Sequence, residues 1–262
     1  GDKYDKIWYM IDGVYSMFGD IAPIKEINML MQKYPQLHLY VDDAHGMSWH
    51  GENGCGRIYE ETIQNQKTIY VSTLAKGFGT MGGLVVFPNT KWYDKVILYG
   101  GPLAHSHPIP PPMMGASIAS AEIHLTSEIY AIQKELSQKL EYTNELLAKT
   151  DLPILSNPNT PIYFIGTGQP AVGYNLNKRI LDDGYYVNIG LFPAVPVKNT
   201  GLRFTINNHH SKNEIKSFID SIVHHYPKAL KEESKNISEV RKAFNLPILE
   251  VEDVVSKLNI TK

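Results

Sequence analysis

The amino-acid sequence predicts an α/β protein, with a large part built on a mostly parallel β-sheet and a smaller α+β part after it. The first half of the chain alternates short apolar runs with segments of helical periodicity, which is the order that a parallel sheet requires. Prolines at positions 153, 158 and 161 interrupt the chain before a second series of strand and helix patterns. With 43% hydrophobic and 20% charged residues among 262, the composition is that of a folded globular protein.

Four apolar runs in the first part are predicted strands, at residues 7–11, 37–41, 68–72 and 83–87. Because these runs are apolar at nearly every position, we expect both faces of their sheet to be covered. A helix is predicted over residues 23–34, since Pro23 suits a first turn and Pro35 ends the pattern. Its buried face is expected to consist of Ile24, Ile27, Leu30, Met31 and Tyr34.

The middle of the chain is predicted to be a loop-rich segment at residues 90–112 and then one long helix at 113–149. The apolar stripe of this helix is Ile118, Leu125, Ile129, Ile132, Leu136, Leu140 and Leu147. Beyond the prolines, strands are expected at 162–165, 185–189 and 202–206, and helices at 171–183 and 211–226. The predicted division is a large domain with its inter-domain helix (1–150), a small α+β domain (151–226) and a helical extension (227–262).

Charge and cysteine content exclude several classes of protein. The net charge of −2 provides no positive field for nucleic acid or an anionic membrane, and no apolar run approaches the ~20 residues of a membrane span. The single cysteine, Cys55, excludes an internal disulfide and is typical of a cytoplasmic protein. The histidine pairs at 209–210 and 224–225 are adjacent in sequence, so their side chains diverge and no metal site is predicted.

Polar residues follow three of the predicted strands, at the edge where open α/β sheets bind ligands. Asp42, Asp43 and His45 follow one strand, Lys76 follows the next in a glycine-rich turn, and Ser16 follows the first. A lysine desolvated at such an edge can act as a nucleophile. Each cluster taken alone has an alternative, either a solvated turn with capping aspartates or an ordinary surface lysine.

Two further motifs are less specific. Glycines 77, 79 and 82 match the dinucleotide-binding pattern, but a strand follows them instead of the helix that would face a pyrophosphate, so we reject that interpretation. Arg203, inside a late predicted strand, can bind a carboxylate with both ends of its guanidinium or form a structural ion pair.

Three motifs occur in a fixed order between residues 13 and 79: Gly13-Val-Tyr-Ser-Met-x-Gly-Asp20-x-Ala-Pro23, Val41-Asp-Asp-Ala-His-Gly46 and Thr73-x-x-Lys76-Gly-Phe-Gly79. Together they resemble the α-oxoamine synthase group of fold-type-I pyridoxal-phosphate (PLP) enzymes, which includes 8-amino-7-oxononanoate synthase, glycine C-acetyltransferase and serine palmitoyltransferase. The resemblance implies the PLP-dependent transferase (aspartate aminotransferase-like) fold, with residues 1–150 in the large, cofactor-binding domain.

The resemblance assigns catalytic roles to three residues. It implies that Lys76 forms the Schiff base with PLP, that Asp42 keeps the pyridine nitrogen protonated, and that His45 bonds the phenolic oxygen and donates a proton. The reaction implied is the condensation of a small amino acid with an acyl-CoA, usually with loss of carbon dioxide.

The resemblance also implies supporting contacts. Ser16, Thr73, Ser106 and His107 are expected to bind the cofactor, and Arg203 the carboxylate of the amino acid. A homodimer with its active sites at the two-fold interface is the expected assembly.

The chain departs from the family pattern. Phe18, Cys55 and His107 stand where the family has an acid, an arginine and a threonine. The family's N-terminal arm and first glycine-rich cofactor loop would precede Gly1, so we expect an N-terminally truncated chain that binds PLP weakly or not at all, whereas the whole protein binds it through Lys76. An aminotransferase of the same fold and a truncated or non-catalytic partner subunit remain as alternatives.

Overall fold

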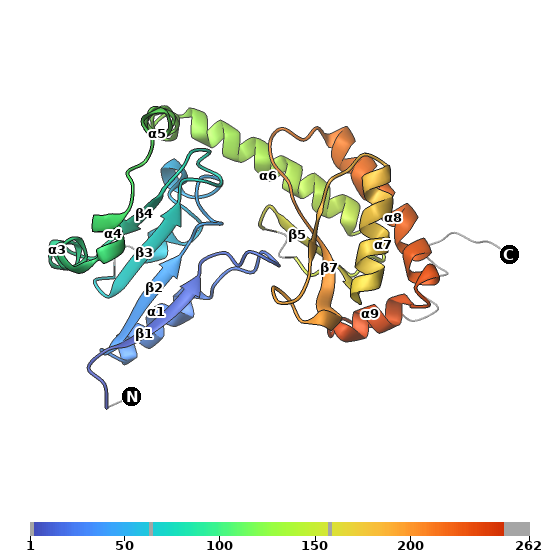
Figure 1. Cartoon of the computed structure of the whole chain (residues 1–262), viewed down its shortest axis with the longest axis horizontal. Coiled ribbons are helices and arrows are strands. Elements are labelled where there is room, and N and C mark those ends of the chain that lie inside the picture. The colour runs from blue at the N-terminus through green and yellow to red at the C-terminus, as the bar shows by residue number, and fades with distance from the viewer. Residues whose placement is uncertain (1–2, 63–64, 157–158, 249–262) are drawn as a thin grey trace. The chain divides into compact units, whose positions relative to one another are not determined.

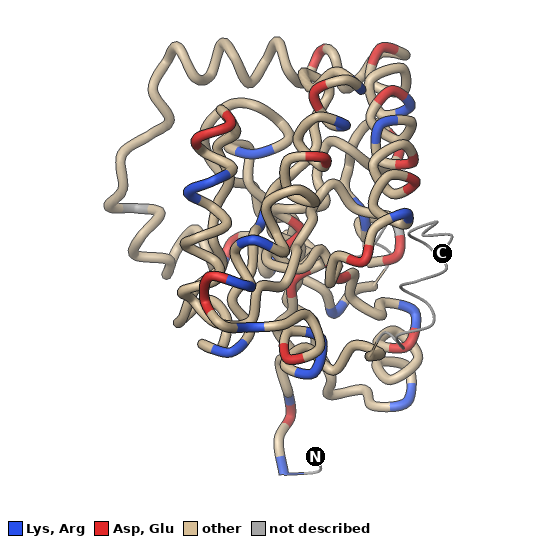
Figure 2. The backbone as a smooth tube through the Cα atoms, turned by 90° about the vertical axis from the view of Figure 1, so that its right-hand side faces the viewer, with Lys and Arg blue, Asp and Glu red and all other residues tan. Residues whose placement is uncertain are grey.

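The computed structural model describes residues 3–62, 65–156 and 159–248 (Figure 1). It divides into two compact units, the first comprising residues 1–16 and 20–137 and the second residues 17–19 and 138–262. Acidic and basic residues are interspersed along the described backbone (Figure 2). Among the described residues, no helix is long and apolar enough to cross a membrane.

The first unit is built on a four-stranded sheet in the order β1-β2-β3-β4. Its strands are β1 (Ile7–Asp12), β2 (Leu37–Asp42), β3 (Thr68–Thr73) and β4 (Gly83–Val86). The first three run parallel and β4 runs antiparallel to β3, which confirms the predicted mostly parallel sheet. The register pairs Asp12 with Asp42, and Asp42 with Val71, so three strands end level at one edge.

Strand β1 is less covered than its apolar sequence predicts. Trp8, Tyr9 and Met10 are 37%, 49% and 67% exposed. In the described sheet β1 pairs only with β2 and forms one edge, so fewer neighbours cover its side chains. The expectation that both faces are buried holds better for β2 and β3, where most residues are buried.

Helix α1 (Ile24–Lys33) begins one residue later than predicted, with Pro23 as its N-cap. Ile24, Ile27 and Met31 are buried, as predicted, and join the core of the sheet. Leu30 and Tyr34 are 47% and 43% exposed, so the prediction is wrong for both. Leu30 lies to one side of the stripe of buried positions, and Tyr34 is already past the last helical residue.

The loop predicted at residues 90–112 is largely helical, so this prediction is wrong. Helices α3 (Thr90–Tyr99) and α4 (Gly101–His105) occupy it, after the short helices η1 (Glu52–Gly54) and α2 (Tyr59–Thr62). The glycine at position 100 separates two helices rather than marking a long loop. The start signal was present in the sequence, since the Asn89 side chain caps α3 by accepting a hydrogen bond from the Trp92 N–H at 3.2 Å.

We expect Asn89→Ala to lower the free energy of unfolding by about 1 kcal/mol, because it removes the side-chain acceptor at the start of α3. Denaturant unfolding measures this loss. Asn89→Ser keeps an acceptor and is expected to restore most of the stability, whereas equal losses in both variants would contradict the capping role.

The single long helix predicted at 113–149 is two helices, α5 (Pro111–His124) and α6 (Glu128–Leu147). At the break, the Thr126 hydroxyl donates to the Ile123 carbonyl at 2.9 Å and accepts from the Glu128 N–H at 3.3 Å. This local capping competes with continuation of the helix. Four residues of the predicted apolar stripe are buried, at positions 129, 136, 140 and 147, and all of them lie in α6. Ile118 in α5 and Leu125 just after it are 60% and 76% exposed.

The second unit contains a three-stranded antiparallel sheet in the order β5-β7-β6. Its elements are β5 (Ile162–Gly168), α7 (Pro170–Asp182), β6 (Asn188–Gly190), η2 (Val197–Asn199), β7 (Thr200–Thr205), α8 (Lys212–Glu232) and α9 (Ile237–Ala243). The predicted strand at 185–189 is shorter and starts later than expected, while β5 and β7 are longer.

Helix α8 does not end at Tyr226 as predicted, because it continues through Pro227 to Glu232. Ala229 and Leu230, beyond the proline, are buried, and this packing favours the continued helix over the break that proline alone predicts. Of the extension at 227–262, residues 249–262 lie outside the described residues, and α9 is the helix that follows α8. The division of the chain at residues 150 and 226 stays a prediction. The boundary between the two compact units falls in the sequence between residues 137 and 138, within α6.

Candidate active site

The turn after β2 carries the first predicted group. Its strand ends at Asp42, whose Oδ1 accepts a hydrogen bond from the Ala44 N–H at 2.9 Å and so starts the turn. The Asp42 carbonyl accepts from the Gly13 N–H at 2.7 Å, which ties this turn to the end of β1. His45 follows, half-buried, and its carbonyl accepts from the Trp49 indole N–H at 2.7 Å.

The turn after β3 brings the predicted lysine to the predicted histidine. Lys76 Nζ lies 2.9 Å from His45 Nε2, although the residues are 31 positions apart in sequence. The Thr73 hydroxyl shapes this turn by donating to the Gly82 carbonyl at 3.1 Å and accepting from the Ala75 N–H at 3.2 Å. Lys76 therefore stands at the sheet edge with a defined partner and is not an isolated surface lysine.

Carboxylates add negative charge at the same edge. Burial raises the pKa of Asp12, the negative charge of Asp42 raises it further, and the positive charge of Lys76 opposes them. Asp12, Asp42 and Lys76 thus share one electrostatic environment. Asp12 is not among the site residues predicted from the sequence, and its position at the end of a third predicted strand is the signal that could have identified it.

The two adjacent aspartates differ in environment. Asp43 is fully buried, where its Oδ2 accepts hydrogen bonds from the Tyr70 hydroxyl at 3.2 Å and the Ile58 N–H at 3.3 Å. Burial raises the pKa of Asp43 to about 6, while those hydrogen bonds lower it. Glycines surround the carboxylate, because a Cβ added at Gly46 would lie 2.1 Å from Asp43 Oδ1. Asp43 is therefore a buried anchor of the turn, whereas Asp42 stays at the sheet edge.

The remaining predicted residues lie around this edge or in the other unit. Ser16 is half-buried in the turn after β1. Ser106 and His107 are exposed in the segment between α4 and α5, and this segment reaches the lysine turn through Ile109, whose Cδ1 would lie 2.7 Å from a Cβ at Gly82. The structure thus brings Asp42, His45, Thr73 and Lys76 to one edge, whereas Ser106 and His107 lie exposed in the neighbouring segment.

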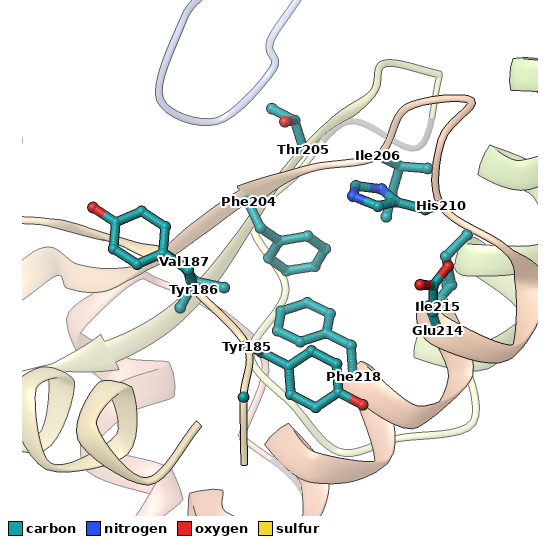
Figure 3. A pocket seen from close by; sticks show the side chains of 11 residues that line it. Tyr185, Tyr186, Val187, Phe204, Thr205, Ile206, His210, Glu214, Ile215 and Phe218 are labelled. Carbon is teal, nitrogen blue, oxygen red and sulfur yellow. The ribbon is translucent and has the colours of Figure 1, made fainter. Parts of the chain in front are cut away.

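Arg203 belongs to the second unit, in β7, opposite Phe164 of β5 and Asn188 of β6. It is half-buried, and this burial lowers the pKa of its guanidinium. A cavity of about 310 Å³ in the same unit is lined by Tyr185, Phe204 and Phe218 (Figure 3). Arg203 is not among the residues that line this cavity.

Comparison with known proteins gives the family of the chain. Residues 2–222 match the family described as aminotransferase class I and II. The 8-amino-7-oxononanoate synthase of Alkaliphilus metalliredigens is 31% identical over 217 residues, which are 82% of this chain and 53% of that protein. That of Alkaliphilus oremlandii is 31% identical over 221 residues, which are 84% of this chain and 54% of that protein. This chain therefore spans about half the length of these curated relatives.

A solved structure agrees with these matches. The serine palmitoyltransferase of S. paucimobilis, solved with a bound PLP–myriocin aldimine, is 26% identical with a TM-score of 0.76, over 85% of this chain and 55% of that chain. This similarity confirms the predicted fold class, and the names of the relatives are those of the group that the motifs resemble. The chain belongs to the aminotransferase class I and II family.

Proposed function

We propose that this chain carries the lysine-bearing part of a PLP-dependent acyltransferase that condenses a small amino acid with an acyl-CoA. The observation that carries the proposal is the 2.9 Å contact between Lys76 Nζ and His45 Nε2, at the same edge of the sheet as Asp42. The similarity to 8-amino-7-oxononanoate synthases and to a serine palmitoyltransferase supports this activity over transamination.

The chemistry of the residues at this edge fits PLP. Lys76 supplies a primary amine for the aldehyde of PLP, and His45 supplies an imidazole for its phenolic oxygen. Asp42 supplies a carboxylate for the pyridine nitrogen, and Thr73 supplies a hydroxyl for the phosphate. The glycines of the turn that follows Lys76, such as Gly79 at φ +78°, leave the backbone open to a ligand. We propose Ser16, Ser106 and His107 as further contacts of the cofactor.

When bound, PLP supplies an electron sink that stabilises negative charge on the α-carbon of the amino acid. The chain's own groups then have distinct tasks. Lys76 Nζ is the point of covalent attachment, and His45 Nε2, within hydrogen-bond distance of it, can hold or transfer a proton there. Asp42 places a negative charge at the edge and favours a protonated pyridine nitrogen.

Arg203 is proposed to bind the carboxylate of the amino acid, because a guanidinium offers paired N–H donors to both oxygens. Arg203→Lys is expected to raise the KM for the amino acid about tenfold while changing kcat much less, as one directed hydrogen bond is lost. Steady-state kinetics of the whole protein test this. Arg179→Lys, on α7 of the same unit, is the matched control, and an unchanged KM in Arg203→Lys would exclude the proposed contact.

The reaction type has its own test. The acyltransferase should release free CoA thiol from an acyl-CoA only when glycine, alanine or serine is present. An aminotransferase would instead form a keto acid without CoA release. We further propose that the whole protein acts as a cytoplasmic homodimer, which size measurement in solution can test.

A further inference from the structure

Ser48 has an unusual backbone conformation three residues after His45. Its φ angle is +77°, in the left-handed region that residues other than glycine seldom occupy, and the residue is only 6% exposed. A strained conformation of this kind persists only where its surroundings impose it. The contacts of Ser48 therefore help to set the shape of the turn that carries His45.

Two helices hold Ser48 from outside its own turn. Its hydroxyl lies 3.1 Å from Nε2 of His124, at the end of α5, and its carbonyl accepts from the Gln133 side-chain amide of α6 at 3.1 Å. His124 Nδ1 lies 2.7 Å from the Ser120 carbonyl, which can only accept, so Nδ1 carries a proton and, in the neutral imidazole, Nε2 accepts from Ser48. His124 itself is 9% exposed.

The same face of α5 also holds the turn that carries Lys76. The Ser120 hydroxyl donates to the Phe78 carbonyl at 2.7 Å, and the Ser117 hydroxyl donates to the Thr80 hydroxyl at 3.0 Å. The Phe78 ring lies on the His124 ring, with centroids 4.7 Å apart and planes tilted by 33°. His124 thus contacts one residue from each of the two turns.

The two turns also touch directly and leave little room for adjustment. A Cβ at Gly77 would lie 2.6 Å from the Met47 carbonyl oxygen and 3.2 Å from the Ser48 Cβ. A change in the backbone of Ser48 would consequently displace the turn after β2 relative to the turn after β3.

We propose that His124 is a positioning residue that keeps His45 and Lys76 in register by holding Ser48 in its left-handed conformation. The proposal rests on the function proposed for Lys76 and His45. His124 acts through Ser48 and Phe78 and is not a catalytic residue. Its sequence context, an isolated histidine in a helical pattern, gave no sign of this role.

The test uses the whole protein and the variants His124→Phe, Ser48→Gly and their combination. His124→Phe keeps a ring against Phe78 but removes the hydrogen bond to Ser48, and Ser48→Gly makes a positive φ favourable without any external support. Two readouts apply. One is the initial rate at which borohydride traps PLP on Lys76, and the other is amide hydrogen exchange in residues 45–49. His224→Phe, at an exposed site in the second unit, is the control.

We expect His124→Phe to slow the borohydride trapping of PLP about tenfold. Amide hydrogen exchange in residues 45–49 should become faster by a similar factor, because a buried hydrogen bond is lost. Ser48→Gly alone should stay near the starting values, and the double variant should return to within about twofold of Ser48→Gly. A double variant as impaired as His124→Phe would show that the effect of His124 does not pass through the backbone of Ser48 and would overturn the proposal, as would an unchanged His124→Phe. If the unmodified protein traps no PLP, the function proposed for Lys76 fails, while the exchange measurement still decides the role of His124.

Discussion

Replacing Lys76 by alanine is expected to abolish borohydride-trapped PLP on the whole protein and to lower acyltransferase turnover by at least about 10³-fold. The side chain has two tasks in the proposed reaction, since its amine is the attachment point and, with His45 at 2.9 Å, a site of proton transfer. Losing both tasks at once should lower the rate of turnover by more than the loss of a general acid–base group alone. Absorbance before and after reduction, followed by peptide mass spectrometry, measures the first effect.

Lys95→Ala is the matched control, because Lys95 is an exposed lysine of the same unit, on α3. We expect it to trap as much PLP as the unmodified protein. If Lys76→Ala still traps PLP with full stoichiometry, another amine is the attachment point, and the assignment of Lys76 is wrong.

Replacing Asp43 by asparagine is expected to stabilise the protein at pH 8 and to leave it little changed at pH 4. The pKa of Asp43 is raised from 3.8 to about 6, so the fold binds this proton more tightly than the unfolded chain does. The stability that the protonated form confers is complete below pH ~4 and is lost as the pH rises through about 6. The loss has an upper limit of about 3 kcal/mol, at 1.36 kcal/mol per pKa unit.

Asparagine avoids this loss because it carries no charge at any pH in this range. The gain at pH 8 should approach this limit, at about 2–3 kcal/mol, since Oδ1 lacks a hydrogen-bond partner among the described residues and the O–H of a protonated carboxyl there is as unsatisfied as an amide donor would be. Denaturant unfolding at pH 4, 6 and 8 measures the difference. Asp94→Asn, at an exposed position of α3, should show no such trend, and a constant difference between Asp43→Asn and the unmodified protein would contradict a raised pKa.

Asp43, which is buried, and Asp42, which is partly exposed, show how much of the site could be predicted from the sequence. The motif Asp42-Asp43-Ala44-His45 placed both carboxylates after one strand, and parallel strands end at one edge, so a cluster at that edge was predictable. The alternative of a solvated turn with capping aspartates is not confirmed, because Asp42 accepts its hydrogen bond from the Ala44 N–H within a turn that no helix directly follows, and Asp43 is buried. Which aspartate lies inside depended on Gly46, Tyr70 and Ile58, which only folding brings together.

Helix ends show the same division between local and distant causes. The caps at Asn89 and Thr126 are local signals, and weighing them would have predicted α3 and the break between α5 and α6. The passage of α8 through Pro227 was not predictable from the proline, because the burial of Ala229 and Leu230 by distant residues outweighs a lost backbone hydrogen bond.

The sequence by itself determined the order of elements, the parallel sheet and the presence of a lysine, a histidine and an aspartate at strand ends, because strand periodicity and turn chemistry are properties of neighbouring residues. Tertiary structure decided the 2.9 Å contact of Lys76 with His45, the burial of Asp43 and the support of Ser48 by His124. These depend on pairs 15 to 76 positions apart, whose distances are set by packing and not by any local preference.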